Sequence, residues 1–262
     1  MLLQLMRFSI LDLVLLKYGT SDTNAFEPDG VDLRRMGALS YIGLRARAVG
    51  VELLVREERP KRCVIFTRKG TGITNLASLR GRSIAFGDQS STIAFSAKYE
   101  LAREGILGAD LRQWDHIEGR KRFLENVYRV GLVQAMRTSL NDHALMVKAV
   151  TSGEFDAGVG RFEFVREHTG RDLQIIHEFS SPPNIWVAAS RLGTNQLALL
   201  RSALLGIESV PSPFIKGHGQ APRLVELDDG YFEPMRVALR NEVARFEGDR
   251  RVSTQVMIQD DE

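Results

Sequence analysis

The sequence has one cysteine, Cys63, eight prolines among its 262 residues, and no long apolar run. One cysteine cannot form an internal disulfide, and it excludes a cysteine-rich metal site. We expect no membrane span, because such a helix needs about 18 uninterrupted apolar residues. The sequence also lacks an excess of charge of either sign, since 35 basic residues against 33 acidic ones leave a formal charge of +2. We therefore expect no nucleic-acid partner, which would need a concentrated basic surface.

Common enzyme signatures are missing as well. The sequence contains no HExxH pair, no paired Cys/His metal spacing, no Gly-x-Ser-x-Gly elbow and no P-loop. The glycine pairs at 70–72 and 217–219 do not sit between a strand and a helix as a dinucleotide fingerprint requires. Cys63 falls within an apolar strand pattern, which favours a core thiol over a nucleophile. We therefore expect no metal site and no cofactor.

The first residues, MLLQLM, look briefly like the apolar part of a signal peptide. Arg7 and Asp12 soon interrupt this run, no basic residue precedes it, and no small-x-small cleavage site follows. On this basis we expect no signal peptide in the sequence. A cytoplasmic location follows if Met1 is the genuine start.

Strand-like and helix-like segments alternate along the chain. A hydrophobic fraction of 44% and a charged fraction of 26% are typical of one large soluble domain or two lobes. Short apolar runs predict strands at 11–18, 62–68, 82–87, 155–159, 173–179 and 185–189. Amphipathic stretches predict helices at 74–79, 93–105, 120–140, 142–153, 162–167, 196–207 and 233–246. This alternation predicts an α/β fold with mostly parallel sheets flanked by helices.

The clearest local signal for a binding site follows the expected strand at 82–87. Asp88 and Gln89 lead into Ser90, Ser91 and Thr92, directly before a helical pattern. A helix N-terminus offers unpaired N–H groups and a partial positive charge, and the hydroxyls add donors. This combination suits a compact oxyanion such as phosphate. The alternative interpretation is simple helix capping, which every helix needs.

Three further side chains are candidates for contact with the anion. His143 lies in the first turn of an expected helix, where its ring can donate a hydrogen bond and, if protonated, add positive charge. Arg161 and Glu163 follow the expected strand at 155–159, where a parallel sheet places its ligand-facing loops. The alternatives are an ordinary satisfied histidine and a solvated helix start.

Five ordered segments resemble one known family. They are GVDLRRMGALSY at 30–41, the strand and linker at 64–81, IAFGDQSST at 84–92, His143 with VTSGEFDAGV at 150–159, and the return segment at 176–192. Together they resemble the substrate-binding proteins of phosphonate/phosphate/phosphite-type ABC transporters, which have the type 2 periplasmic binding fold. The resemblance spans about residues 11–245. The segment at 118–140 looks inserted, and the family's first strand, helix and signal peptide have no counterpart here.

The resemblance implies two α/β lobes with an oxyanion bound in the cleft between them. We expect the lobes to close on this ligand. Lobe 1 would comprise 1–72 plus 185–262, and lobe 2 would comprise 73–184 and carry the Ser-Ser-Thr loop. The crossovers would lie near Arg68–Ile73 and Ser181–Trp186. The implied function is solute binding for an ABC importer or a sensor, with an ABC permease as partner and a periplasmic location.

The same resemblance assigns roles to individual residues. Ser91, Thr92 and His143 would contact the oxyanion, with Ser90 beside them, and the loop at Gly37–Tyr41 would supply contacts from lobe 1. Glu163 falls where some members hold a ligand amino group. Arg161 has no counterpart role, and Asn184 stands where a second acidic partner is usual, which disfavours aminoalkyl phosphonates.

Two other functions remain open from the sequence. An enzyme on the same fold, similar to the thiamine-pyrimidine synthase or chorismate-dehydratase types, would use His143 and Glu163 as acid and base. A remnant without a complete site would bind nothing. Turnover of a candidate ligand separates the enzyme from the binding protein, and a binding isotherm separates the binding protein from the remnant.

Overall fold

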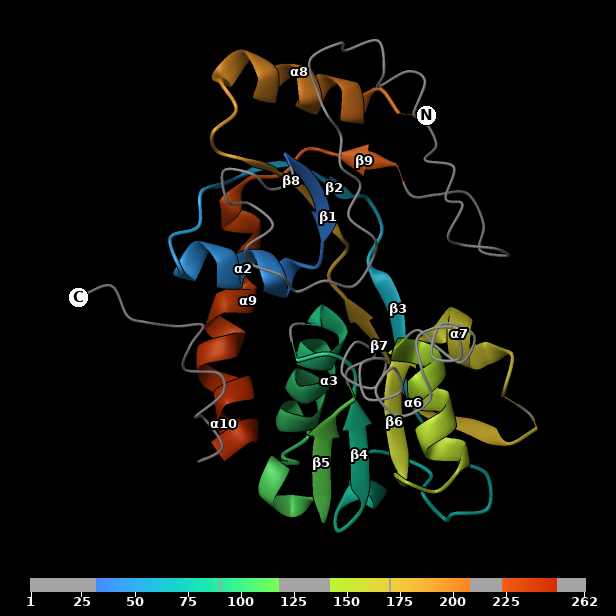
Figure 1. Ribbon diagram of the computed structural model, residues 1–262. Helices are drawn as coiled ribbons and strands as arrows, with labels where there is room; N and C mark the ends of the chain where they lie inside the picture. Colours follow the sequence, from blue (N-terminus) through green and yellow to red (C-terminus); the bar gives the residue numbers. More distant parts are fainter. Residues whose placement is uncertain (1–31, 90, 118–141, 170, 208–222, 249–262) are drawn as a thin grey trace, which may run out of the picture. The chain divides into compact units, whose positions relative to one another are not determined.

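The computed structural model describes residues 32–89, 91–117, 142–169, 171–207 and 223–248 (Figure 1). The expected strand at 11–18 and the expected helix at 120–140 lie outside the described residues. Within them, no helix combines the length and apolar character that a bilayer crossing requires. The chain divides into two compact units, each with its own sheet.

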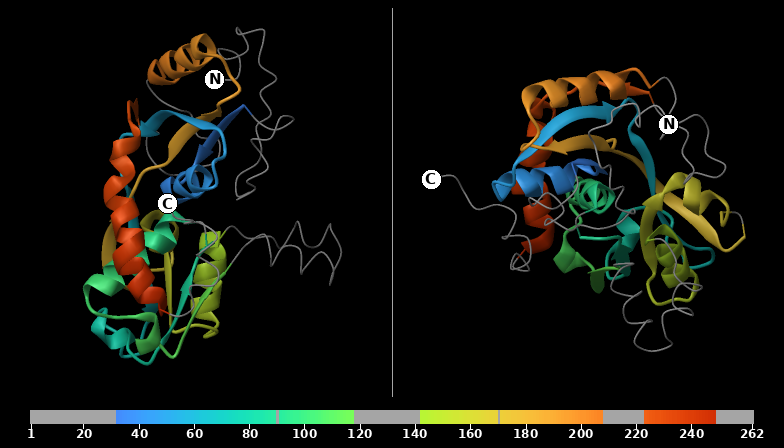
Figure 2. Two further views of the ribbon diagram at one scale, coloured as in Figure 1. Left: turned by 90° about the vertical axis from the view of Figure 1, so that its left-hand side faces the viewer. Right: turned by 45° about the horizontal axis from the view of Figure 1, so that its top comes forward.

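The first unit contains the described residues 32–60, 182–207 and 223–234. Its elements are β1 (Leu33–Met36), α2 (Ala38–Ala46), β2 (Val51–Glu57), β8 (Ile185–Ala189), α8 (Thr194–Leu205), β9 (Leu224–Val225) and a 3-10 turn at Asp229–Phe232. The sheet order is β1-β8-β2-β9, with every neighbouring pair antiparallel. Leu200 and Leu204 of α8 share a core cluster with Leu54 and Ala188, so α8 covers one face of this sheet (Figure 2).

The second unit contains the described residues between 61 and 181, together with 235–248. Its strands are β3 (Lys61–Arg68), β4 (Ser83–Phe86), β5 (Gln113–His116), β6 (Ala157–Arg161) and β7 (Leu173–Ser181). Its α-helices up to β7 are α3 (Thr92–Arg103), α6 (Asp142–Thr151) and α7 (Phe162–Arg166), with 3-10 turns at Ala77–Leu79 and Gly108–Asp110. The sheet order is β5-β4-β6-β3-β7.

The α/β class is confirmed, but the expectation of mostly parallel sheets is wrong. In the second unit, β4 runs parallel to β5 and β6, whereas β3 runs antiparallel to β6 and β7. The first sheet is antiparallel throughout. Alternation of strands and helices predicts parallel pairing only where a helix connects neighbouring strands. Neither β3–β6 nor β3–β7 is joined by a single crossover helix.

The two faces of the second sheet have separate cores. Cys63, Ile65 and Phe179 belong to the cluster that includes Ile93 and Ala97 of α3. Alternate residues, such as Val64 and Phe66, belong instead to the cluster that includes Met146 of α6 and Val165 of α7. Because side chains alternate along a strand, this register assigns every sheet residue to the α3 face or the α6 face.

From Met235 on, the C-terminal helical segment belongs to the second unit rather than to lobe 1 as predicted. It runs through α9 (Glu233–Ala238), a π-helical stretch (Leu239–Val243) and α10 (Ala244–Glu247). Phe246 is 1% exposed, and its ring lies 5.9 Å from Phe86 and 5.6 Å from Trp114. This packing joins the segment to the core cluster that α3 covers, so residues 235–248 do not belong to the predicted lobe 1.

The first boundary between the units also precedes the predicted one. The division falls between Pro60 and Lys61, and the second falls between Ser181 and Pro182. The whole of β3 pairs within the second sheet, so residues 61–72, which were predicted for lobe 1, belong to the second unit. The second division lies at the start of the expected crossover at Ser181–Trp186.

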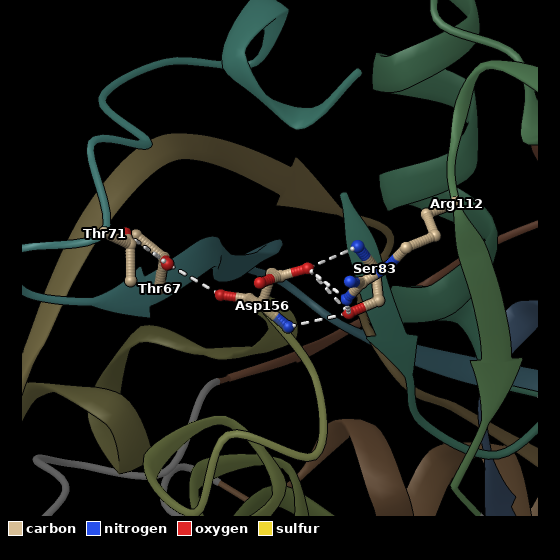
Figure 3. Close-up of polar contacts among 5 residues, drawn as sticks. All are labelled: Thr67, Thr71, Ser83, Arg112 and Asp156. Atoms are coloured by element: carbon tan, nitrogen blue, oxygen red, sulfur yellow. Dashed lines mark hydrogen bonds and ion pairs between the residues drawn. The ribbon is translucent and has the colours of Figure 1, made fainter. Parts of the chain in front are cut away.

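A polar clamp joins strands at one edge of the second sheet (Figure 3). Oδ2 of Asp156 accepts hydrogen bonds from the Ser83 N–H at 2.8 Å, the Ser83 hydroxyl at 2.9 Å and Nη2 of Arg112 at 2.9 Å. The Asp156 N–H donates to Ser83 Oγ at 2.9 Å, and the Thr67 hydroxyl donates to the Asp156 carbonyl oxygen at 2.6 Å. Asp156 thus ties the start of β6 to the start of β4 and the end of β3.

Candidate anion-binding site

The opposite edge of the second sheet gathers the predicted site residues of this unit. Strands β4 and β6 are parallel, so their carboxyl ends, at Phe86 and Arg161, meet at one edge. Strand β3 is antiparallel to β6 and starts there with Lys61, and β7 ends there with Ser181, the register partner of Lys61. Helix α3 follows β4 and α6 precedes β6, so both helices begin at this edge.

The start of α3 has the features of an anion-binding helix terminus. Ser91 is the N-cap residue, with an extended backbone, and its Oγ accepts the N–H of Ile93 at 3.2 Å. Thr92, the first helical residue, is 2% exposed, and the first turn carries no acidic residue. The capping interpretation is therefore confirmed for Ser91. Capping uses a lone pair of the hydroxyl oxygen, so the Ser91 proton can still be donated to an anion. Ser90 lies outside the described residues.

A chain of polar contacts fixes the backbone just before this helix. The Gly87 carbonyl oxygen lies 2.7 Å from Nδ1 of His116, and Nε2 of the same ring lies 3.1 Å from Nζ of Lys98. A carbonyl oxygen only accepts, so Nδ1 carries the proton and Nε2 accepts from Lys98. Lys98 is 3% exposed and pairs with Glu247. Burial, and next the Lys98 charge, lower the pKa of His116 to about 4, so the ring is neutral at pH 7.

Sequence reasoning missed this chain of contacts, although one signal was present. Lys98 lies four positions after Ala94 and three before Leu101, both of which are buried on α3. A lysine on the apolar face of a helix needs a partner, because an unpaired buried charge is costly. The identity of that partner, 149 positions away in the sequence, has no local signal.

His143 lies near the same edge as an uncharged ring. Its ring stacks on Phe164, with centroids 4.6 Å apart and planes 16° apart. Burial, and next the charges of Arg161 and Lys61, lower the pKa of His143 to about 3. The ring is therefore neutral at pH 7 and does not add the positive charge that a protonated His143 would bring. The neutral ring can still donate one hydrogen bond to an anion.

Arg161 and Glu163 form a loose pair at the end of β6. Nε of Arg161 lies 3.5 Å from Oε2 of Glu163, and neither buried atom makes a hydrogen bond within the described part of the chain. Lys61, at 8% exposed, lies two residues before Cys63, and Arg161 is the register partner of Cys63. Cys63 is fully buried, and burial raises its pKa to about 12. Its predicted place in the core is confirmed, and its thiol is protonated at neutral pH.

Two predicted site residues, Tyr41 and Asn184, lie in the first unit. Gly37–Tyr41 is not a loop as expected, because Gly37 is the N-cap of α2 and Tyr41 lies within that helix. The Tyr41 hydroxyl donates to Oδ1 of Asp229 at 2.7 Å. Nδ2 of Asn184 donates weakly to both oxygens of Glu57, at 3.4 and 3.5 Å, and Nε of Arg35 also donates to Glu57. The structure thus joins Asn184 to a buried carboxylate of its own unit.

The described residues hold no group of three or more His, Cys, Asp or Glu side chains placed to bind a metal ion.

The second unit combines a helix N-terminus, two hydroxyls, a neutral histidine and two cationic side chains at one sheet edge. Such groups bind an anion by donating hydrogen bonds to it and by opposing its charge.

Comparisons with known proteins relate the chain to one family and to several solved structures. A sequence profile described as "ABC transporter, phosphonate, periplasmic substrate-binding protein" matches residues 20–221. PhnD1 from Prochlorococcus marinus, solved in complex with methylphosphonate, is 17% identical, with a TM-score of 0.61 over 83% of this chain and 80% of its own. XAC2383 from Xanthomonas citri, solved bound to ATP, is 18% identical, with a TM-score of 0.59 over 90% of this chain and 83% of its own.

A third similar structure is PA3383 from Pseudomonas aeruginosa, a binding protein component of an ABC phosphonate transporter. It is 15% identical, with a TM-score of 0.58 over 89% of this chain and 78% of its own. At these identities the structural likeness establishes the fold, which is the two-lobed periplasmic-binding-protein fold expected from the sequence. No curated protein sequence matches the chain.

Proposed function

Since this chain belongs to the family of periplasmic substrate-binding proteins of phosphonate-type ABC transporters, we propose that it binds a small phosphorus oxyanion at the N-terminus of α3. Solute binding of a small anion is the role of the family. The observation that carries the assignment to this site is the start of α3. Ser91 and Thr92 open that helix without an acidic residue in its first turn, at the sheet edge where Lys61 and Arg161 lie.

The proposed site binds a dianion without a basic protein surface. The N–H groups of a helix's first turn carry a partial positive charge and point along the helix axis. Hydrogen bonds to a charged group contribute about 1.5–3 kcal/mol each, so a few donors suffice for micromolar affinity. This agrees with a chain whose formal charge is only +2. Neutral His143 serves as a further donor in this proposal.

The proposal is a binding protein rather than an enzyme on the same fold. An acid–base pair would have to come from His143 and Glu163, and the low pKa of His143 leaves it a weak base. Members of the family are transport binding proteins. Incubation of phosphonates with the protein, followed by phosphorus NMR, tests for turnover. We expect every ligand to be recovered unchanged.

We also propose an ABC permease as partner and the periplasm as location. Both follow from the role of the family. Closure of the two predicted lobes on the ligand remains a prediction, which small-angle scattering with and without saturating ligand tests.

The deciding experiment is calorimetric titration with phosphate, phosphite and methylphosphonate. Thr92→Asp places a carboxylate where the anion would lie and should abolish binding of all three. The matched control is Thr194→Asp, because Thr194 is likewise the first residue of a twelve-residue helix but is exposed. Thr92→Ser, which keeps the hydroxyl, guards against a folding defect and should bind. Binding by Thr92→Asp as tight as by the parent would overturn the site.

A further inference from the structure

We propose that the ligand of this site carries a second acidic group beside its phosphorus oxyanion, and that Arg161 and Lys61 bind that group. The inference rests on the proposed function and deepens it by naming a ligand class, the small phosphonocarboxylates. Four observations on the second unit carry it: strand order, the face on which each side chain lies, unused hydrogen-bonding atoms, and local charge.

The strand order places the relevant groups in a row along one sheet edge. From β4 to β7 the order is β4-β6-β3-β7, and the groups at this edge are the start of α3, Arg161, Lys61 and Ser181. Neighbouring strands lie about 4.8 Å apart. Arg161 is therefore one strand away from the anion-binding helix terminus, and Lys61 is two strands away. This spacing suits two acidic groups on one short molecule.

The register places these groups on the same face of the sheet as α3. Cys63 and Phe179 belong to the core cluster under α3. Arg161 is the partner of Cys63 across β3–β6, and Lys61 and Ser181 are partners two residues beyond Cys63 and Phe179. Because side chains alternate along a strand, all three belong to the α3 face. A ligand held at the start of α3 therefore lies over the same row.

Unused hydrogen-bonding atoms occur in this row. Nε of Arg161 is buried and donates to no acceptor among the described residues. Ser181 is 1% exposed, and its Oγ likewise has no partner in the described chain. Buried donors without acceptors are rare and destabilising in folded proteins. A ligand carboxylate supplies two acceptor oxygens in one plane, which matches the fork of an arginine side chain.

The charges around the row favour an added negative group. Among the described residues, the charged groups that act on Cys63 are Lys61, Arg161 and Glu163. Glu163 approaches Arg161 without forming a hydrogen bond, so Nε of Arg161 can still donate one to a ligand. A ligand carboxylate would be attracted by the two cations and repelled by Glu163. Removal of the Glu163 charge should therefore strengthen its binding.

The test compares three ligands that share a phosphonate: methylphosphonate, phosphonoacetate and 2-aminoethylphosphonate. We expect phosphonoacetate to bind at least about tenfold tighter than the other two, the effect of one charge-assisted hydrogen bond. Arg161→Gln should weaken phosphonoacetate about tenfold and change methylphosphonate less than about threefold. Glu163→Gln should tighten phosphonoacetate. Arg166→Gln and Glu167→Gln make the same charge changes at exposed positions and serve as controls.

Each outcome decides one statement. Equal affinity for phosphonoacetate and methylphosphonate would overturn the second acidic group while leaving the oxyanion site intact. If 2-aminoethylphosphonate bound most tightly of the three and Glu163→Gln weakened its binding, the row would bind an ammonium group, and the inference would be overturned. Binding of none of the three ligands while phosphate or phosphite binds would overturn the inference alone. Binding of none of these five anions, or no effect of Thr92→Asp on their binding, would overturn the proposed function itself. Circular dichroism of each variant establishes that it is folded.

Discussion

His116 donates a hydrogen bond from Nδ1 to the carbonyl oxygen of Gly87, 2.7 Å away, and so ties the end of β5 to the residue that follows β4. The contact requires a neutral ring of one tautomer, whose other nitrogen accepts from Lys98. The backbone that leads into the anion-binding end of α3 is therefore held by an imidazole that must not take up a second proton.

Low pH should destabilise the protein through its two buried histidines. The pKa of His116 is lowered from 6.5 to about 4, and that of His143 to about 3, so the unfolded chain binds more protons than the folded one below pH 6.5. Their contribution is complete above pH 6.5 and is lost as the pH falls towards 4. We expect His116→Gln to remove roughly 2 kcal/mol of this pH dependence, measured by urea unfolding at pH 7 and pH 5. His168→Gln, at an exposed position, should leave it unchanged.

Loss of the Glu247 carboxylate should leave Lys98 as an unpaired buried charge. Lys98 is 3% exposed, and burial lowers its pKa while Glu247 opposes that shift. We expect Glu247→Gln to lower the free energy of unfolding by about 3 kcal/mol or more, because removal of one partner of a buried pair strands the other. The double variant Lys98→Met with Glu247→Gln should recover most of that loss. The exposed control Glu104→Gln should change stability little. A double variant as unstable as Glu247→Gln would contradict this account.

The Asp156 clamp should affect stability without affecting ligand binding, because it lies at the edge opposite the start of α3. We expect Asp156→Asn to cost about 1–3 kcal/mol, as the ionised acceptor of three hydrogen bonds is lost. Burial alone would raise the pKa of Asp156, but hydrogen bonds from Ser83 and the charges of Arg112 and Arg82 lower it below 3.8. Its contribution is therefore present above pH 3.8 and lost as the pH falls through the lowered value. Unfolding curves and ligand titration of the same sample separate the two effects.

Thr92→Val should weaken ligand binding, and the stabilisation by ligand measures this loss separately from any change in the stability of the free protein. Valine keeps the branched shape and removes the hydroxyl, so we expect about tenfold weaker binding of methylphosphonate. At a ligand concentration of about 100 times the parent Kd, the ligand should stabilise the parent by about 2.7 kcal/mol. The variant should gain about 1.4 kcal/mol under the same conditions. Unfolding with and without ligand measures the difference, and equal stabilisation would exclude the hydroxyl from the site.

Much of the second unit could be predicted from local patterns. The expected strand at 82–87 and helix at 93–105 correspond to β4 and α3, because contiguous apolar residues and a polar cap mark both. Strand β5 was missed, since Gln113–His116 is short and polar and is held by pairing with β4. The direction of β3 was also missed, because no local pattern records which neighbour a strand will pair with. Both errors concern contacts between segments far apart in the sequence.

The site was predictable to a similar extent. Ser91 and Thr92 lie a few residues after β4, Arg161 ends β6, and Glu163 follows it closely, so their place at one sheet edge follows from the chain order. The charge state of His143 did not follow from its place in a first turn, because it depends on burial and on two cations from β3 and β6. Lys61 and Ser181 gave no signal as site residues. They join the row only through the antiparallel register of β3 and β7.

The pairing of Lys98 with Glu247 also constrains the order in which the chain acquires its structure. When residues 61–181 have left the ribosome, every strand of the second sheet has been synthesised. Phe246 and the Glu247 carboxylate that pairs with Lys98 have not. Until the segment 235–248 has been synthesised, the apolar side chains of α3 that pack against Phe246 are exposed. Lys98 then lacks the Glu247 carboxylate that would offset the cost of burying its charge. Most of the second unit is therefore synthesised before residues 182–234 of the first unit, but it is completed only after them.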